Sequence, residues 1–313
     1  MSRVAITGST GLIGEALIAS LTADGHTVQR ITRRAEVAGP NDIVWNLDAG
    51  ILAPEPLEGV DTVVHLAGAP IRTGWWTAST KRAILDSRRI GTRLVATTLA
   101  GLSHPPSVLV SGSAVGFYGD AGDRILTESS PAGADFMARV CAAWEKAAAP
   151  ARDAGIRVVH SRTGVTLAQE GPLIEKVELP FRMGVGGKVG SGRQYVPWIS
   201  LDDLVRGLRF LIDHDVDGPV NLTAPEAVTN HELTKALGEV LNRPTVFRIP
   251  ALAVRALYGT IGETLATVSQ RVVPQRLLDA GFAFTHTDVR AALRAALVPA
   301  GADSSRRVGR RRI

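Results

Sequence analysis

The chain reads Arg3-Val4-Ala5-Ile6-Thr7-Gly8-Ser9-Thr10-Gly11-Leu12-Ile13-Gly14 close to its first residue. Residues 3–7 are mostly apolar and β-branched, which predicts a buried strand, and residues 15–23 have the composition of a helix. The glycines between them follow a G-x-x-G-x-x-G spacing, one residue longer in its first gap than the dinucleotide-binding fingerprint. This order of strand, glycine turn and helix predicts a loop that holds a pyrophosphate.

Each glycine of this loop has a physical role that a larger residue would disturb. One makes the tight turn, one lets the backbone approach the pyrophosphate, and one lets the helix lie close on the strand. The start of the helix then offers free N–H groups and a partial positive charge to an anion. An ordinary strand-to-helix turn is the alternative. The residues assigned to cofactor binding on this basis are Gly8, Ser9, Thr10, Gly11, Leu12, Ile13 and Gly14.

The next predicted strand, residues 27–32, ends in two arginines instead of an acid. A site for NAD places Asp or Glu here, where the carboxylate accepts hydrogen bonds from the ribose 2′-hydroxyl. This chain has Thr32, Arg33 and Arg34 at this point, and no carboxylate appears until Glu36. Guanidinium groups pair with the 2′-phosphate of NADP. We therefore predict NADP as the cofactor, with a solvated pair of surface arginines as the alternative.

The composition is that of an ordinary globular protein. Apolar residues make up 45% and charged residues 21% of the 313 residues, which suffices for a large core. The single cysteine, Cys141, excludes an intrachain disulfide and fits a reducing compartment, so we expect a cytoplasmic protein. The sequence shows no leader pattern and no apolar run of about 18 residues or more, so we expect no membrane span.

The net charge of +5 arises mainly from the C-terminal segment. Residues 301–313 carry five arginines and one acid, a balance of +4, which leaves the rest of the chain near +1. Such a cluster suits an anionic partner such as nucleic acid. A disordered terminus that keeps the chain in solution is the interpretation we prefer. We therefore treat residues 298–313 as a basic flexible tail and expect no nucleic-acid partner.

Strands and helices alternate through the middle of the chain. Predicted strands cover residues 60–68, 107–111 and 156–161, and predicted helices cover residues 77–102 and 136–149. This alternation predicts an α/β fold, a Rossmann-like doubly wound parallel sheet with helices on both faces. Ligands of such sheets lie beyond the carboxyl ends of the strands, so the turns that follow the strands are expected to share one crevice.

In this order, the motifs resemble the extended branch of the short-chain dehydrogenase/reductase superfamily, and more narrowly its atypical, epimerase-like subgroup of nucleoside-diphosphate-sugar epimerase homologues. The resemblance spans residues 3–297. It implies NADP(H) binding, an N-terminal Rossmann-like domain over residues 1–170 that also receives later strands, and a substrate lobe with a small helical C-terminal domain over residues 171–297. Beyond the glycine loop, the motifs are His65-Leu66-Ala67-Gly68, Ile84-Leu85-Asp86-Ser87-Arg88, Ser111-Gly112-Ser113-Ala114, Arg162-Thr163-Gly164-Val165, Gly190-Ser191-Gly192-Arg193-Gln194, Trp198-Ile199-Ser200-Leu201-Asp202-Asp203-Leu204 and Gly218-Pro219-Val220-Asn221-Leu222-Thr223-Ala224-Pro225.

The resemblance implies further cofactor contacts by position. Leu66, Ala67 and Gly68 match a turn on the adenosine and pyrophosphate side, where small side chains admit a ligand close to the backbone. Arg88 lies in the next helix, in a Ser-Arg pair that the subgroup uses near the cofactor. By position, Ser111 and Thr166 lie toward the nicotinamide. A plain buried strand end and a solvated helical arginine are the alternatives for the turn and for Arg88.

The catalytic signature of the superfamily is incomplete in this chain. The resemblance implies a serine together with Tyr-x-x-x-Lys, in which the lysine lowers the pKa of the tyrosine. Ser113 matches the serine, but no tyrosine lies between Tyr118 and Tyr195. We take Ser113 and Tyr118 as the candidate catalytic residues, with a structural role as the alternative for Tyr118. We expect any hydride transfer to depend on Ser113 and only weakly on Tyr118.

Other polar residues carry weaker signals. No metal site is predicted, because the histidines and the cysteine lack metal-ligand spacing. We assign Asp202 and Asp203 to capping of the following helix. Arg182, Lys188 and Arg193 lie in glycine-rich segments, where they would bind a diphosphate or carboxylate of a substrate or remain solvated.

Two functions follow from these observations. The first is an NADP(H)-dependent oxidoreductase or epimerase-like enzyme that acts on a carbonyl or hydroxyl group, with a nucleotide sugar as one candidate substrate. The second is a non-catalytic NADP(H)-binding sensor or regulatory protein. The missing Tyr-x-x-x-Lys favours the second, whereas Ser113 and the substrate-lobe loops favour the first. We expect a small-molecule substrate and no membrane partner, and we leave a homodimer open.

Overall fold

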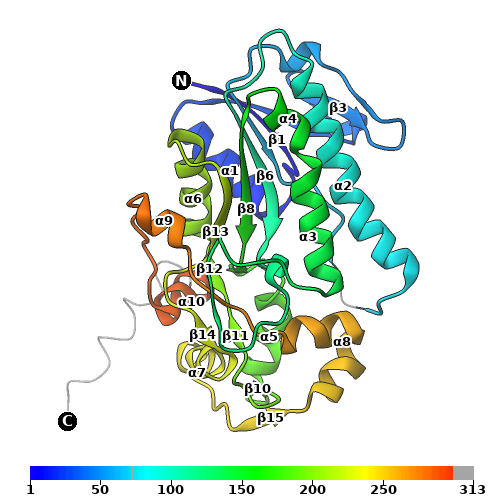
Figure 1. Ribbon diagram of the computed structural model, residues 1–313. Coiled ribbons are helices and arrows are strands. Elements are labelled where there is room, and N and C mark those ends of the chain that lie inside the picture. The colour runs from blue at the N-terminus through cyan, green and yellow to red at the C-terminus, as the bar shows by residue number, and fades with distance from the viewer. Residues whose placement is uncertain (72–73, 299–313) are drawn as a thin grey trace, which may run out of the picture.

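The protein is described here by a computed structural model that covers residues 1–71 and 74–298. It is an α/β protein built on an eight-stranded sheet, which runs through the middle of the molecule in Figure 1. The strand order is β13-β8-β6-β5-β1-β2-β3-β4. These strands are β1 (Arg3–Thr7), β2 (Thr27–Thr32), β3 (Ile43–Asn46), β4 (Ile51–Leu52), β5 (Thr62–His65), β6 (Val108–Ala114), β8 (Arg157–Thr163) and β13 (Gly218–Leu222). The predicted basic tail, residues 298–313, lies outside the described residues except for Val298.

The sheet is doubly wound around β1, as the alternation of strands and helices predicts. Thr7 at the end of β1 pairs in register with Ile31 of β2 on one side and with His65 of β5 on the other. Helices connect β1 to β2, β5 to β6 and β6 to β8, and each of these connections returns the chain in the same direction, which gives a mainly parallel sheet. β4 is antiparallel to β3 and forms one edge, and β13 adds a parallel strand at the other edge. The predicted Rossmann-like α/β fold is confirmed.

Helices cover both faces of the sheet (Figure 1). On one face, Leu17 of α1 (Leu12–Ala23) and Leu208 of α6 (Leu201–Asp213) join a core cluster with strand residues such as Ile6. On the other face, Val95 and Leu99 of α2 pack in a second core cluster. Burying a side chain of this size contributes about 1.5–3 kcal/mol, so the two clusters hold the helices to the sheet. The helices around the sheet are α1 (Leu12–Ala23), α2 (Ala78–Ala100), α3 (Phe136–Ala147), α4 (Ala149–Asp153) and α6 (Leu201–Asp213).

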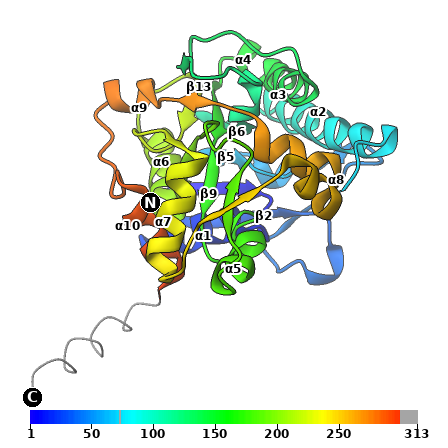
Figure 2. The ribbon, with the colours of Figure 1, turned by 90° about the horizontal axis from the view of Figure 1, so that it is seen from below.

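A smaller region with its own core lies below the sheet in Figure 1 and toward the viewer in Figure 2. Its core cluster is centred on the fully buried Trp198 and includes Phe181 and Leu293. Its helices are α5 (Ile174–Arg182), α7 (Asn230–Leu241), α8 (Ala251–Thr267) and α10 (Val289–Leu297), whereas α9 (Gln275–Asp279) packs against β13 at the edge of the sheet, where its Leu277 joins the first core cluster. Its short strands are β9 (Val165–Leu167), β10 (Gly187–Val189), β11 (Tyr195–Val196), β12 (Trp198–Ser200), β14 (Val228–Thr229), β15 (Phe247–Ile249) and β16 (Arg271–Val272), the last paired with β7 (Ile125–Leu126). The 3₁₀ helices of the chain are η1 (Ala35–Val37), η2 (Glu55–Leu57) and η3 (Val115–Tyr118).

The loop that follows β5 is bound to a kink in α8. Gly259 interrupts this helix with φ 70° and ψ −175°, a conformation that favours glycine. The backbone of Gly74 fits into the kink: its N–H donates to the carbonyl of Tyr258 at 2.9 Å, and its carbonyl accepts from the N–H of Ile261 at 3.0 Å. The N–H of Trp76 adds a bond to Thr260 at 3.0 Å. The segment after the predicted cofactor turn is therefore fixed to the C-terminal region.

Among the described residues, we find no helix with the length and apolar character that crossing a membrane requires.

Candidate functional site

The glycine loop lies at the carboxyl end of β1, in the centre of the sheet. Gly8 has a φ of 71°, and a Cβ at this position would lie 2.9 Å from the carbonyl carbon of Leu66. A Cβ on Gly14 would lie 2.3 Å from the carbonyl oxygen of Gly8. Both neighbours are backbone atoms, which cannot move aside. Gly8 and Gly14 are therefore needed for the close packing of loop, helix and adjacent strand.

Gly11 is different, because the protein itself leaves room for a side chain there. Its φ of −94° suits any residue, and among the described residues other than its chain neighbours a Cβ would come within 4 Å only of the carbonyl oxygen of Gly8, at an ordinary 3.4 Å. Gly11 is also the N-cap of α1 and offers no side chain to the free N–H groups of the first turn. A pyrophosphate in this open space would accept hydrogen bonds from those groups. The loop thus fits a dinucleotide.

The turn after β5 is held against the glycine loop by Thr7. Its Oγ1 accepts hydrogen bonds from the backbone N–H groups of Leu66 and Ala67, each at 3.1 Å. Because these two N–H groups occupy the lone pairs of Oγ1, the Thr7 hydroxyl donates its own proton to Nδ1 of His65, at 2.7 Å. The neutral imidazole therefore carries its proton on Nε2. This arrangement fixes the backbone of the turn beside Gly8, where the resemblance places the cofactor.

Burial of two histidines predicts that the protein loses stability in mild acid. His65 is fully buried and His160 is nearly so, and burial lowers the pKa of each to about 4. In the unfolded chain the histidine pKa is about 6.5, so below that pH the unfolded chain binds protons that the folded protein excludes. We expect each histidine to lower the free energy of unfolding by about 2 kcal/mol between about pH 6.5 and pH 5, measured by urea unfolding. The exposed-site variant His231→Gln should show the same pH dependence as wild type, and a flat profile for wild type would contradict the prediction.

Arg88 lies in α2 and contacts the same turn. Its Nη1 donates to the carbonyl oxygens of Ala69 at 3.0 Å and Ile84 at 3.2 Å, and its guanidinium lies 5.0 Å from the ring centre of Trp144. Burial lowers the pKa of Arg88. A Cβ on Gly68 would lie 3.3 Å from Cζ of Arg88, so a larger residue there would press on the guanidinium. The structure thus brings Arg88 and the predicted turn together, with the guanidinium committed to backbone carbonyls.

The remaining predicted cofactor residues lie at the end of β2, in β6 and in β9. Arg33 and Arg34 are exposed at the end of β2, where Thr32 Oγ1 accepts a hydrogen bond from the N–H of Arg34 at 3.1 Å. Ser111 is fully buried in β6, and its Oγ has no hydrogen-bond partner among the described residues. Thr166 is half-buried in β9, paired with Ile199 of β12.

Ser113 belongs to a buried polar network at the end of β6. It pairs in register with Arg162 of β8, which in turn pairs with Asn221 of β13. Ser113 Oγ donates to Oε1 of Glu145, in α3, at 2.7 Å. Arg162 holds both oxygens of that carboxylate, with Nε to Oε1 at 2.8 Å and Nη2 to Oε2 at 2.9 Å. The end of β6 thus presents a serine backed by a nearly buried ion pair.

Tyr118 lies on the far side of the same arginine. It is 2% exposed, its hydroxyl donates to Oδ1 of Asn221 at 2.6 Å, and it accepts from Nη1 of Arg162 at 3.0 Å. Burial raises its pKa. Glu128 extends the network by accepting from the N–H of Asn221 at 3.0 Å. Both hydrogen-bonding directions of the Tyr118 hydroxyl are therefore used inside the protein, the geometry of the structural alternative.

Sequence reasoning missed Glu145. It lies in the helix predicted over residues 136–149, and nothing in the sequence spacing marks this carboxylate. Arg162 and Asn221, by contrast, both lie in motifs that carry the resemblance. Their proximity to Tyr118 and Ser113 is visible only once α3 is packed against β6 and β8.

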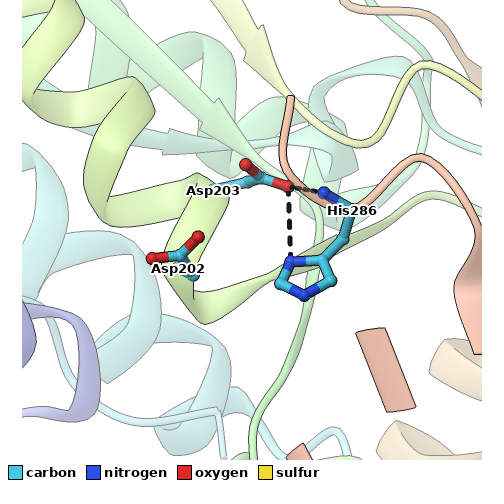
Figure 3. Close-up of side chains that lie close together, drawn as sticks. All are labelled: Asp202, Asp203 and His286. Carbon is cyan, nitrogen blue, oxygen red and sulfur yellow. Dashed lines mark hydrogen bonds and ion pairs between the residues drawn. The ribbon is translucent and has the colours of Figure 1, made fainter. Parts of the chain in front are cut away.

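One group of acidic and histidine side chains, within the part of the chain that the structure describes, has ligand atoms within 4.8 Å of one another: Asp202, Asp203 and His286 (Figure 3). The carboxylate of Asp203 accepts hydrogen bonds from the backbone N–H groups of Thr285 at 2.7 Å and His286 at 2.8 Å. The N-cap of the helix is Ser200, and neither aspartate takes that role. Asp203 therefore ties the segment before α10 to the start of α6, and we interpret the group as structural.

Two adjacent tryptophans in the loop before α2 have different surroundings. Trp75 is 58% exposed, whereas the ring of Trp76 packs edge-on against the ring of Phe136, with ring centres 5.2 Å apart. Arg182 forms an ion pair with Glu178 of its own helix at 2.7 Å.

Comparison with known proteins adds relatives along nearly the whole chain. Residues 4–223 match the model of the NAD dependent epimerase/dehydratase family, and residues 249–296 match a domain of unknown function. An epimerase family protein of Mycobacterium tuberculosis is 43% identical over 291 residues, which cover 93% of this chain and 96% of that protein. The mouse epimerase family protein SDR39U1 is 36% identical over 299 residues, which cover 93% and 98% of the two chains.

Solved structures agree with these relatives. The human epimerase family protein SDR39U1, solved with NADPH, has a TM-score of 0.85 and 32% identity, and the match covers 94% of this chain and 98% of that one. UDP-glucose 4-epimerase of Thermus thermophilus, with a TM-score of 0.68 and 16% identity over 93% of this chain and 96% of that one, shares the fold alone. The predicted resemblance to epimerase-like short-chain dehydrogenase/reductases is confirmed. This chain belongs to the NAD dependent epimerase/dehydratase family.

Proposed function

We propose that this protein binds NADP(H) and works as an oxidoreductase or epimerase-like enzyme on a hydroxyl or carbonyl group. The observation that carries the proposal is that the glycine loop, the two exposed arginines, the turn after β5 and Ser113 all lie at the carboxyl ends of neighbouring strands. Ligands of open parallel sheets bind at this edge. The human relative solved with NADPH supports the choice of cofactor.

Each part of the cofactor has residues of fitting chemistry. The N–H groups at the start of α1 suit the pyrophosphate, and Arg33 and Arg34 suit the 2′-phosphate. The backbone of residues 66–68 suits the adenosine side, and Ser111 and Thr166 the nicotinamide side. When bound, the nicotinamide supplies hydride exchange, and Ser113 orients the reacting oxygen of the substrate. We further propose that residues 171–297 form the substrate lobe, and a nucleotide sugar is the first substrate class to test.

A second candidate, a non-catalytic NADP(H) sensor, is favoured by one observation. The helix that would carry Tyr-x-x-x-Lys begins with Phe136 and has Val140 four residues later, and Tyr118 is buried in hydrogen bonds. Paired screens of nucleotide sugars and carbonyl compounds, followed by the absorbance of the reduced nicotinamide, separate the two candidates. Turnover supports the enzyme. Tight NADPH binding with no turnover across the screen supports the sensor, and no binding of either cofactor contradicts both.

We expect NADPH to bind roughly ten- to a hundredfold more tightly than NADH, because a phosphate–arginine pair contributes about 1.5–3 kcal/mol. The double variant Arg33→Ala/Arg34→Ala should lose this preference and keep its NADH affinity, which titration calorimetry with both cofactors measures. Arg294→Ala, an exposed arginine of α10, is the matched control and should keep the preference. Equal affinities in the wild-type protein would contradict the assignment of Arg33 and Arg34.

A further inference from the structure

The one proton of the Ser113 hydroxyl is committed inside the protein. Ser113 Oγ donates to Oε1 of Glu145 at 2.7 Å, a distance at which a hydroxyl donates to a carboxylate. A serine hydroxyl has one proton and two lone pairs, so Ser113 retains only acceptor capacity. A substrate oxygen that hydrogen-bonds to Ser113 must therefore bring its own proton. An alcohol satisfies this condition, whereas a ketone or aldehyde does not.

Arg162 holds the Glu145 carboxylate in the position that this bond requires. The two parallel hydrogen bonds, 2.8 Å and 2.9 Å long, form a bidentate pair and fix the plane of the carboxylate. The side chains of Arg162 and Glu145 are only 4% and 12% exposed. Arg162 is itself held by Tyr118 and lies 3.5 Å from the ring centre of Phe117. Glu145 is thus a carboxylate with a fixed orientation and little contact with water.

The other titratable groups around Glu145 do not compete for a proton near neutral pH. Cys141, one turn earlier on α3, has a pKa raised to about 12 by burial. His160 of β8 has a pKa lowered to about 4 by burial. The thiol therefore keeps its proton and the imidazole does not take one. Burial also raises the pKa of Tyr118, so its hydroxyl keeps the proton that it donates to Asn221. Glu145 is the acceptor that remains.

We propose that Glu145 is the proton acceptor and positioning residue behind Ser113, in the place of the missing Tyr-x-x-x-Lys, and that the ligand Ser113 recognises is an alcohol. This rests on the proposed NADP(H)-dependent activity. In oxidation, the substrate O–H proton passes to Ser113 Oγ as the Ser113 proton passes to Oε1 of Glu145. The substrate C–H bond breaks with its two electrons as a hydride to oxidised nicotinamide, and a C=O bond forms. Ser113 ends unchanged, Glu145 ends as a carboxylic acid, and reduction is the reverse.

Neutron diffraction on perdeuterated wild-type crystals tests the direction of the hydrogen bond without any substrate, because it locates deuterium directly. We expect a deuteron on Ser113 Oγ that points to Oε1 of Glu145, and no deuteron on either carboxylate oxygen. A deuteron on Glu145, or a Ser113 deuteron that points away from it, would overturn the proposal. This experiment needs no variant that could fail to fold.

The kinetics of Glu145→Gln test the proton transfer from Ser113 to Glu145. They are measured on an alcohol and its carbonyl product that the wild-type protein interconverts. A general base contributes about a hundredfold or more, so kcat for alcohol oxidation should fall by about that factor with KM and the NADPH dissociation constant nearly unchanged. Glu145→Asp, which keeps the carboxylate, should recover part of kcat. Lys146→Gln, at the exposed neighbouring position, should match wild type. Unchanged kcat in Glu145→Gln would overturn the relay.

The outcomes separate this inference from the function it rests on. Wild-type protein that binds neither NADPH nor NADP⁺ contradicts the proposed function, while the neutron map still decides the direction of the Ser113 bond. Wild-type protein that binds NADPH but turns over no alcohol or carbonyl in the screen overturns the relay and leaves the sensor. Turnover that survives in Glu145→Gln overturns the relay alone.

Discussion

Gly11→Val is expected to abolish NADPH binding in a protein that still folds. Valine places a Cβ where the ligand-free backbone has room for one, because among the described residues that atom meets only the carbonyl oxygen of Gly8, at 3.4 Å, and φ is −94°. It would fill the space into which we place the pyrophosphate. Losing two charge-assisted hydrogen bonds of about 1.5–3 kcal/mol each weakens binding by roughly two to four orders of magnitude. Titration calorimetry measures the affinity, and circular dichroism with thermal unfolding measures the fold.

Two other glycines give matched comparisons for this variant. Gly14→Val places a Cβ 2.3 Å from the carbonyl oxygen of Gly8, so it should lower the stability as well as the affinity. Gly101→Ala, at a C-cap with φ −92° and ordinary contacts, should change neither. A folded Gly11→Val protein with wild-type NADPH affinity would show that the loop does not hold the pyrophosphate. The G-x-x-G-x-x-G spacing alone does not distinguish Gly11 from Gly14, because only the packed structure shows which Cβ meets backbone.

The fold is readable from the sequence because its signals are local. The first two strands lie where the apolar pattern puts them, at residues 3–7 and 27–32. Element ends depend on more distant contacts. The helix α8 continues past Gly259 to Thr267, because the kink at Gly259 is held by the backbone of Gly74. The helix predicted over residues 136–149 divides at Ala148, because a new helix begins at Ala149 with Pro150 in its first turn. No local pattern reports a partner nearly two hundred residues away.

The sequence predicts only part of the candidate site, for the same reason. Ser113 and Tyr118 follow from a motif and from the scarcity of tyrosines, so sequence reasoning finds them. Their shared partner does not follow, because the bond from Ser113 to Glu145 joins residues 32 apart and the bond from Arg162 to Glu145 joins residues 17 apart. Neither separation has a sequence signature. The superfamily's usual machinery is missing from the sequence, and the structure supplies a candidate replacement from side chains on three different elements.

Arg162→Met is expected to lower the free energy of unfolding by about 3–5 kcal/mol, the cost of leaving a buried carboxylate without its cation. Glu145 is 12% exposed and Arg162 supplies two of its hydrogen bonds, so water replaces little of what is lost. The hydroxyl of Tyr118 also loses a donor. Urea unfolding near neutral pH measures the change. Arg290→Met is the matched control, because its ion pair with Glu239 is exposed and its loss should have little effect.

The double variant Arg162→Met/Glu145→Gln tests whether the loss comes from the unpaired charge. Removing both charges leaves no buried ion without a partner, so the double variant should be more stable than Arg162→Met alone. If the single variant unfolds at the same urea concentration as wild type, the Glu145 carboxylate is hydrated or protonated once the Arg162 guanidinium is removed. The ion pair would then not hold Glu145 in place behind Ser113. A large loss in the single variant with partial recovery in the double variant would establish that the Arg162 guanidinium compensates the Glu145 charge and holds that carboxylate in place behind Ser113.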